Sequence, residues 1–244
     1  MVELRLSFGN AAADYERGRP DWPDEIATVG CVPAESAVLD LGAGTGKLTR
    51  ILARRFARVT AVEPDAAMRA LIPVGEPLDG AAETIPLADD SVEGVFCAEA
   101  FHWFDWPVAV RETARVLRPR GVVVLCFNMP DGGPYIPLPE EGWEIARRYR
   151  RPGVEPGVTI LESGAWREPF ADPASPFEPL REESFRHVHE QDADALVSRV
   201  LSTSIFASLP EEERRELGEQ LRAVTPEGKY RTQLRAEVFW TRLR

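Results

Sequence analysis

Three closely spaced glycines between two acidic residues are the densest chemical signal in this sequence. The segment Val38–Lys47 (VLDLGAGTGK) places glycines at positions 42, 44 and 46, and Glu63 follows the next apolar stretch. Glycines let the backbone approach a ligand closely and turn into a helix whose first N–H groups are free. A carboxylate about 20 residues further on can accept hydrogen bonds from both hydroxyls of a ribose. The pattern therefore predicts a ligand that contains adenosine.

The spacing of the glycines discriminates between adenosine ligands. Dinucleotide folds use GxGxxG to reach a pyrophosphate, whereas here the third glycine comes one place early and Asp40 precedes the run. A phosphate-binding loop is a poor match, because Lys47 is followed by Leu48 where magnesium needs Ser or Thr. An anion at position 40 suits a ligand with an ammonium group. A glycine turn that binds no ligand is the alternative.

The elements around this turn alternate between strands and helices. Apolar runs predict strands at 37–41, 58–62, 92–98 and 122–127, and helical spacing predicts helices at 47–56, 66–71 and 106–117, with Asp65 as an N-cap. Alternation of this kind predicts an α/β fold with a doubly wound, mostly parallel sheet. A ligand would then lie at the carboxyl ends of the strands.

The second half of the chain has a different character. Ten prolines between positions 130 and 179 leave room only for a helix at 140–151, so we expect a proline-rich insertion or lid rather than a second core. Helices are predicted at 192–206 and 211–223, and strands at 185–189 and 234–243 that close the sheet antiparallel. We expect one domain over 1–244, with a cofactor-binding part (1–128), the insertion or lid (129–180) and a completion of the sheet (181–244).

Composition narrows the class of partner. Forty acidic and 29 basic residues give a formal net charge of −11, which disfavours nucleic acid and membrane surfaces and favours a small-molecule acceptor. Cys31, Cys97 and Cys126 lack CxxC spacing, so we expect free thiols and no metal. No apolar run is long enough for a signal peptide or a membrane span, and we expect a cytoplasmic protein. No motif specifies the oligomeric state.

The glycine run resembles the first motif of the class I S-adenosylmethionine-dependent methyltransferases, D/E-x-G-x-G-x-G, which matches Asp40–Gly46. Further segments between residues 8 and 128 are similar to the trans-aconitate methyltransferase-like branch, in the order of that family. They are Phe8, Ala12, Tyr15, RPDWP at 19–23, Ala82–Pro86, Asp89–Ser91, AFHWFD at 100–105 and Glu112–Gly121.

The resemblance implies a role for each matching position. Gly42, Ala43 and Gly44 would pass under the methionine part of S-adenosyl-L-methionine, and Asp40 would help to hold its amino group. The remaining cofactor positions that it implies are Glu63 at the ribose, Ala82 and Glu83 at the adenine, Tyr15 and Arg19 over the methionine carboxylate, Glu99 and Phe101 after the fourth strand, and Pro64. Gly80-Ala81-Ala82 lacks an Asp that many relatives have before this Glu, so adenine recognition would rest on backbone groups or Glu83.

Methyl transfer from a sulfonium is an in-line displacement, so the protein mainly aligns the reactants and excludes water. His102 is a candidate general base for a hydroxyl or carbon acceptor, whereas a carboxylate acceptor needs none; packing is the alternative role for this side chain. His102 and Trp103 are also candidates for the acceptor pocket, while Trp103 and Phe104 could instead cap the core. His187 and His189 are expected on a solvated strand face.

A cluster of arginines near the middle of the chain has two possible roles, and two other functions are alternatives to methyl transfer. The arginines at 147, 148, 150 and 151 could receive an anionic acceptor, or they could simply stabilise a helix C-terminus. A non-catalytic S-adenosylmethionine-binding domain with a regulatory or partner-binding role is the main alternative to an enzyme. A dinucleotide-dependent oxidoreductase is disfavoured by the glycine spacing. No motif identifies the acceptor atom.

Overall fold

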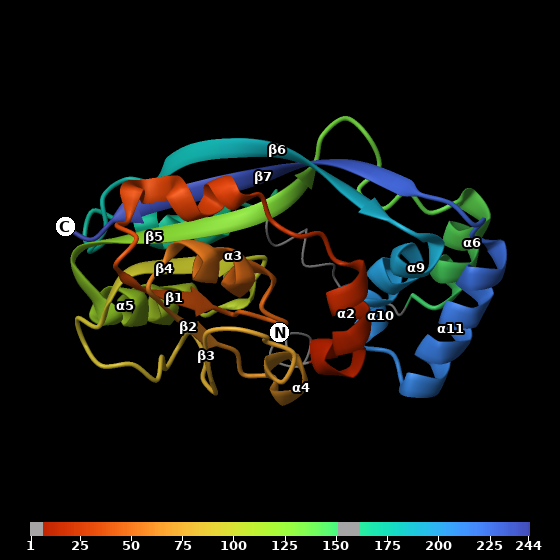
Figure 1. The fold of residues 1–244 in the computed structure, drawn as a ribbon, viewed down its shortest axis with the longest axis horizontal. Helices are drawn as coiled ribbons and strands as arrows, with labels where there is room; N and C mark the ends of the chain where they lie inside the picture. Colours follow the sequence, from red (N-terminus) through yellow and green to blue (C-terminus); the bar gives the residue numbers. More distant parts are fainter. Residues whose placement is uncertain (1–6, 151–161) are drawn as a thin grey trace.

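A seven-stranded sheet forms the framework of the protein (Figure 1). The structure is a computed structural model that describes residues 7–150 and 162–244. The strand order is β3-β2-β1-β4-β5-β7-β6; the first five strands in this order pair in parallel, and β7 pairs antiparallel with both β5 and β6. The strands are β1 (Ala37–Leu41), β2 (Arg58–Val62), β3 (Glu76–Leu78), β4 (Val92–Ala98), β5 (Leu117–Pro130), β6 (Arg181–Gln191) and β7 (Tyr230–Arg242). The predicted mostly parallel sheet with an antiparallel end is confirmed.

Sequence patterns missed one strand and shortened three others. β3 is an edge strand of three residues that contains Pro77 and is largely exposed, so it carries no apolar run to detect. The strands predicted at 122–127 and 185–189 are the central parts of β5 and β6, and the strand predicted at 234–243 misses the first four residues of β7 and extends one residue beyond its end. These strands are long because β7 is paired on both sides, which satisfies its backbone groups along its whole length.

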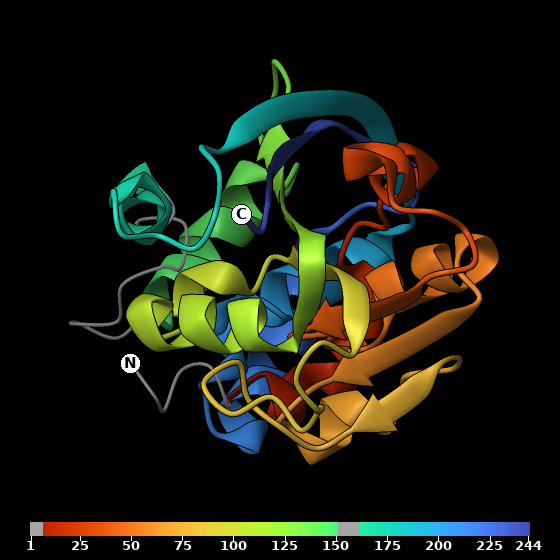
Figure 2. The same cartoon turned by 90° about the vertical axis from the view of Figure 1, so that its left-hand side faces the viewer.

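Helices cover both faces of the sheet (Figure 2). On one face, α3 (Lys47–Arg55) and the 3-10 segment η2 (Asp24–Cys31) pack against alternate residues of the strands in one hydrophobic cluster. On the other face, α5 (Trp106–Val116), η4 (Ala165–Arg167) and α8 (Glu168–Ala171) form a second cluster. Successive side chains of a strand point to opposite faces of the sheet, so alternate residues of the same strands contribute to the two clusters.

A helical lobe lies at the end of the sheet where β6 and β7 extend beyond the other strands (Figure 1). It comprises α2 (Ala12–Gly18), α6 (Glu140–Arg148), α9 (Ala193–Leu201), α10 (Ser204–Ala207) and α11 (Glu211–Val224). The proline-rich segment contributes side chains to this lobe, and its role as an insertion or lid stays a prediction. Ile136 and Leu138, from the proline-rich segment, pack with Leu196 and Leu217 in a third hydrophobic cluster.

Local side-chain hydrogen bonds set the helix ends. The predicted N-cap Asp65 accepts hydrogen bonds from two backbone N–H groups of α4 (Ala66–Arg69), which confirms that prediction. The helix predicted at 192–206 divides into α9 and α10. The hydroxyls of Ser202 and Thr203 bond back to carbonyls of α9, which competes with continuation of the helix. None of the helices in the two described ranges is long and apolar enough to cross a membrane.

Candidate active site

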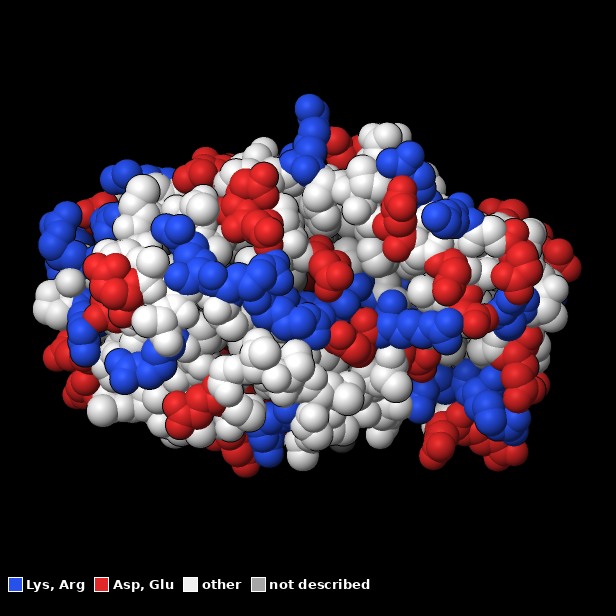
Figure 3. All heavy atoms as spheres, viewed as in Figure 1, with Lys and Arg blue, Asp and Glu red and all other residues white. Residues whose placement is uncertain are grey.

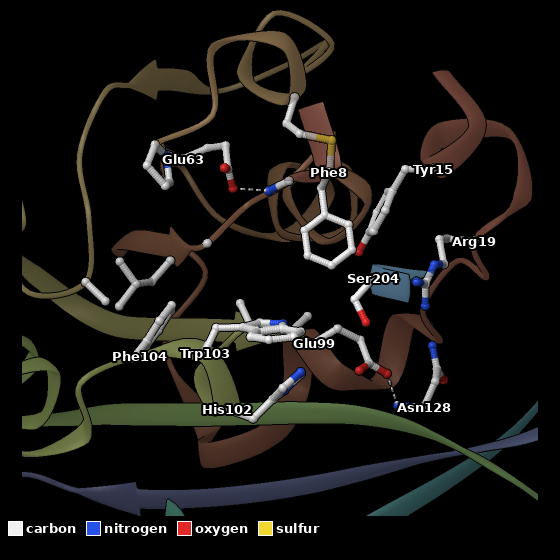
Figure 4. A pocket seen from close by; sticks show the side chains of 18 of the residues that line it. Phe8, Tyr15, Arg19, Glu63, Glu99, His102, Trp103, Phe104, Asn128 and Ser204 are labelled. Atoms are coloured by element: carbon white, nitrogen blue, oxygen red, sulfur yellow. Dashed lines mark hydrogen bonds between the residues drawn. The ribbon is translucent and has the colours of Figure 1, made fainter. Parts of the chain in front are cut away.

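A cavity of about 500 Å³ lies between the carboxyl edge of the sheet and the helical lobe (Figure 4). The ends of β1, β2, β4 and β5 contribute one side, and η1 (Ser7–Ala11), α2 and α10 contribute the other. A smaller cavity of about 30 Å³ adjoins it and shares Tyr15, Arg19, Glu99 and Asn128. The location agrees with the rule that ligands of open α/β sheets lie outside the carboxyl ends of the strands.

The glycine loop after β1 forms one edge of both cavities. The backbone N–H groups of Gly42 and Ala43 donate to the carbonyl of Val62 at 2.9 and 3.1 Å, which anchors the loop to the end of β2. Gly42 has a φ of +72°, and a Cβ at this position would lie 2.6 Å from the Cβ of Ala100. A side chain at position 42 would therefore clash as well as strain the backbone.

Glu63 at the end of β2 ties this loop to the next helix. Its Oε2 accepts from the N–H of Gly44 and its Oε1 from the N–H of Asp65, both at 2.9 Å. The side chain lines the large cavity but is only 8% exposed, and this burial raises its pKa. Each carboxylate oxygen keeps a second lone pair, so the group can still accept hydrogen bonds from a pair of ligand hydroxyls.

Asp40 is a buried carboxylate with one oxygen unpaired. Its Oδ2 accepts from the hydroxyl of Thr49 at 2.6 Å, while its Oδ1 has no hydrogen-bond partner among the described residues. Burial, reinforced by the nearby charge of Glu63, raises the pKa of Asp40 to about 7. Because Asp40 lines the smaller cavity, a cationic group there would satisfy both the free oxygen and the charge.

The helical lobe presents Tyr15 and Arg19 on the opposite wall. Arg19 follows the last residue of α2, and its Nε and Nη2 donate to the side chain and carbonyl of Ser202 at 3.0 and 2.8 Å. Its guanidinium carbon lies 5.2 Å from the centre of the Tyr15 ring. Burial raises the pKa of Tyr15 to about 12, so its hydroxyl stays a hydrogen-bond donor at neutral pH.

Glu99 and Asn128 lie at the ends of β4 and β5 and line both cavities. The Oε1 of Glu99 accepts from the backbone N–H of Asn128 at 2.6 Å, and burial raises the pKa of Glu99. Glu99 has a φ of +53°, an uncommon conformation for a residue other than glycine, and its N–H donates to the carbonyl of Cys126. The chain therefore turns sharply after β4 to bring this carboxylate to the cavity.

The far end of the cavity is lined by Pro64, Ala81, Ala82 and Glu83. The Oε1 of Glu83 accepts from the N–H of Asp105 at 2.9 Å, which holds the segment after β3 against the start of α5. Ala81, where many relatives are expected to carry Asp, lines the wall with a methyl group. This end can offer a flat ligand backbone groups and apolar contact but no carboxylate at position 81.

His102 and Trp103 lie in η3 (Phe101–Trp103) and both line the cavity. The His102 ring is 4.9 Å from the Trp103 ring, and its Nδ1 has no partner among the described residues. Burial, together with the charge of Arg19, lowers the pKa of His102 to about 4, so the imidazole is neutral at physiological pH. Trp103 contacts Phe8 edge to face at 6.1 Å and forms part of the wall.

The structure brings nearly all of the candidate residues together. Phe101 is the exception: its side chain is buried in the sheet core against Trp166 and Phe170 and lines neither cavity. The candidates that line one or both cavities are Tyr15, Arg19, Asp40, Gly42, Ala43, Gly44, Glu63, Pro64, Ala82, Glu83, Glu99, His102 and Trp103. Phe104 lines the cavity and also packs against the core.

The described arginines near the end of α6 and the histidines of β6 lie apart from the cavity walls. Arg147, Arg148 and Arg150 are exposed and absent from both cavity walls, and Arg151 lies outside the described residues. Arg147 and Arg148 occupy the last turn of α6, which fits the alternative of a stabilised helix C-terminus. The histidines of β6 are half-buried and hydrogen-bonded rather than solvated.

Several cavity residues escaped sequence reasoning. They include Met68, Asn128, Tyr135, Thr203 and Ser204. The only sequence signal for these residues was the end of the apolar run at 127, which places Asn128 at the ligand edge of the sheet. Met68 comes from α4, and the others come from loops or from the helical lobe, whose position depends on tertiary packing.

Comparison with known proteins agrees with this geometry. The family model of the methyltransferase domain matches residues 39–125. An uncharacterised methyltransferase-like protein of Schizosaccharomyces pombe is 34% identical over 230 residues, which cover 91% of this chain and 86% of that protein. The chain belongs to the class I S-adenosylmethionine-dependent methyltransferases.

Two further matches support the family and its fold. An uncharacterised methyltransferase of Mycobacterium tuberculosis is 48% identical over 133 residues, which cover 53% of this chain and 55% of that protein. The match to the mycobacterial relatives thus spans about half of their length. A solved type II methyltransferase of Anaeromyxobacter dehalogenans superposes with a TM-score of 0.57 at 23% identity, covering 93% of this chain and 97% of that one. The resemblance to the trans-aconitate branch stays a prediction.

Membership in this family makes S-adenosyl-L-methionine the cofactor, and the cavity residues fit that molecule. The unpaired oxygen of Asp40 suits an ammonium group, and the exclusion of a side chain at Gly42 suits close backbone contact. In contrast, no group of three or more metal-ligating side chains occurs in the described ranges.

Proposed function

We propose that this methyltransferase transfers the methyl group of S-adenosyl-L-methionine to a small molecule by in-line displacement. The observation that carries the proposal is a pair of adjoining cavities whose two ends differ in their lining. One end has the glycine loop with the buried carboxylates of Asp40 and Glu63, and the other is bounded by Phe8, Trp103 and the helical lobe. A charged nucleoside fits the first end and an acceptor fits the second.

The contacts of each cavity residue support a division of the cofactor along the cavity. We assign the ribose hydroxyls to Glu63, the adenine to Pro64, Ala82 and Glu83, and the methionine part to the opposite end. There, Gly42, Ala43 and Gly44 would lie beneath it, Asp40 and Glu99 would hold its ammonium group, and Tyr15 and Arg19 would hold its carboxylate. These assignments place groups of one charge opposite groups of the other, which is the arrangement that a zwitterion requires.

The bound cofactor supplies an electrophilic methyl group on a positively charged sulfur. The residues of this chain then have to align the acceptor and exclude water, and the aromatic faces of Phe8 and Trp103 would also attract the positive charge. His102 would contact the acceptor. A base with a pKa of about 4 has little driving force to take a proton at neutral pH. An acceptor whose nucleophilic atom does not have to lose a proton, such as a carboxylate, therefore suits this cavity best.

Surface charge supports a small-molecule acceptor over nucleic acid. Figure 3 shows a band of basic side chains across one face, interleaved with acidic ones. On α3, the Nζ of Lys47 lies 3.1 Å from a carboxylate oxygen of Asp21, and the Nη1 of Arg50 lies 3.0 Å from one of Glu16. Basic side chains that are already paired with carboxylates offer little attraction to a phosphate backbone.

Calorimetric titration tests the cofactor part of the proposal. S-adenosylmethionine and S-adenosylhomocysteine should bind at one site, and NAD should not. A screen of metabolite extracts with isotopically labelled methyl donor then tests transfer, and a labelled product of low mass is the expected result. Absence of binding for both nucleosides would overturn the proposal.

The alternative of a non-catalytic binding domain makes a different prediction in the same screen. It would bind the nucleosides and label nothing. Trp103 lines the cavity wall rather than filling the space beside it, so the structure offers room for an acceptor, and we favour the enzyme.

A further inference from the structure

A hydrogen bond between two strands reaches the methionine end of the cavity from behind. His187 lies on β6, and Asn128 lies at the end of β5; β7 separates these strands. The Nε2 of His187 is 2.7 Å from the Oδ1 of Asn128. The two side chains meet across β7, where the residue paired with Asn128 is the small Ala236. This contact could not be predicted from the sequence, because 58 residues separate His187 from Asn128 in the chain.

The contact fixes which end of the Asn128 amide faces the cavity. An amide oxygen only accepts hydrogen bonds, so the Nε2 of His187 must carry the proton and donate it. The Nδ2 of Asn128, which has two protons to donate, then faces away from His187. Figure 4 shows this nitrogen pointing toward the guanidinium of Arg19 at the edge of the cavity.

Two donors therefore face the same space. The Nη1 of Arg19 has no hydrogen bond to any described residue, whereas its other two nitrogens are held by Ser202. Without His187, the Asn128 amide could turn and offer its oxygen to Arg19. That bond would occupy one N–H of Arg19 and turn the N–H groups of Asn128 away from the cavity. With His187 in place, the two groups converge on a position that suits an anion.

We infer that His187 is a positioning residue that keeps the Asn128 amide turned so that its N–H groups, with Arg19, bind the carboxylate of the cofactor's methionine part. The inference rests on the proposed function. It adds two residues to the cofactor site that no sequence motif indicates. It also explains why Asn128, only 6% exposed, lines both cavities with a polar group.

The test compares two ligands that differ only at this end of the molecule. S-adenosylhomocysteine carries the amino acid group, and 5′-methylthioadenosine lacks it. His187→Leu should weaken binding of S-adenosylhomocysteine about 10-fold, the loss of one hydrogen bond to a charged group. Its affinity for 5′-methylthioadenosine should change less than about twofold. His187→Gln, which can still donate to Asn128, is the matched control and should retain most of the affinity.

Asn128→Asp gives a second, stronger perturbation. It replaces the donor with a carboxylate oxygen opposite the ligand carboxylate, so binding of S-adenosylhomocysteine should weaken by more than about 30-fold. Its pairing with His187 should also raise the pKa of that imidazole, which proton NMR can follow. Thermal unfolding of each variant reports whether the fold is retained.

The outcomes separate the inference from the proposed function. Equal losses for both nucleosides, or none for either, would overturn the positioning role of His187 while leaving the cofactor assignment intact. Wild-type protein that binds neither nucleoside would overturn the proposed function instead. Nitrogen NMR of the ligand-free protein supplies an independent check. The Nε2–H tautomer of His187 is expected, and the Nδ1–H tautomer would contradict the orientation of the amide.

Discussion

The substitution Asp40→Asn should destabilise the folded protein at acid pH and stabilise it at alkaline pH. The carboxylate is 1% exposed, accepts one hydrogen bond from Thr49 and has a pKa of about 7 in the folded protein, against an ordinary value of 3.8. The raised pKa means that the folded state binds the proton more tightly than the unfolded state does. The favourable contribution of protonated Asp40 is therefore complete below pH 4 and disappears as the pH rises to about 7.

The size of the effect follows from the shift. A difference of about 3 pKa units corresponds to about 4 kcal/mol of stability lost between these limits, at about 1.4 kcal/mol per unit. Asn cannot ionise, but it buries an amide N–H without a partner, at a cost of about 1–3 kcal/mol. At pH 8, Asp40→Asn should thus be more stable than the wild type by about 1–3 kcal/mol, and below pH 4 less stable by a similar amount.

Cofactor affinity should also depend on pH, in the direction opposite to the stability contribution of protonated Asp40. Only ionised Asp40 attracts an ammonium group, so the affinity of the wild type for S-adenosylhomocysteine should rise with pH up to about 7. Urea unfolding and calorimetry from pH 4 to pH 8, on both proteins without and with the ligand, measure the two effects. Parallel stability curves for the two proteins would refute the reasoning about the buried charge. An equal pH dependence of binding in both would refute the ammonium assignment.

Three further substitutions test separate parts of the structure. Glu63→Ala removes the proposed acceptor of the ribose hydroxyls and should weaken S-adenosylmethionine binding by about 1–3 kcal/mol in a calorimetric titration; an unchanged dissociation constant would discredit the assignment. Gly18→Ala places a Cβ 2.1 Å from the backbone nitrogen of Arg199, so α2 and α9 must move apart. Urea unfolding should show that the free energy of unfolding falls by about 1–3 kcal/mol. A decrease below about 0.5 kcal/mol would mean that the two helices adjust without strain. His102→Ala should lower kcat/KM by less than about 10-fold, because an imidazole with a pKa of about 4 is a weak base at neutral pH; a loss of about 100-fold or more would show that the imidazole takes a proton from the acceptor.

The fold could be predicted from the sequence where a strand or helix shows a clear apolar pattern over several consecutive residues. β1, β2 and β4 match their predicted bounds because each is an apolar run ended by a glycine, a proline or a turn. β3 could not be found, since an edge strand of three residues needs neither apolar side chains nor length. The third hydrophobic cluster was hidden because Ile136 and Leu138 stand between prolines and show no periodicity.

The residues of the candidate site also differ in how far the local sequence determines their position. Residues 40–44 and Glu63 belong to one strand-turn-helix unit and the strand that follows, so their proximity is dictated locally. Asn128 and Ser204 reach the cavity only through the packing of β5 and of the helical lobe. Phe101 differs from its neighbours because consecutive residues of a short 3-10 helix point in different directions, so Phe101 enters the core while His102 and Trp103 face the cavity.

The polar wall of the cavity joins distant parts of the chain. Arg19 reaches the cavity because α2 ends beside α9, where Gly18 leaves room for the backbone of Arg199 and Ser202 receives the guanidinium. The glycine loop and Glu63, in contrast, are held by hydrogen bonds among β1, β2 and the start of α4. The nucleoside half of the site therefore depends on the sheet. The half that would hold the methionine group and the acceptor depends on docking of the helical lobe, so changes in the lobe should alter methyl transfer more than adenosine recognition.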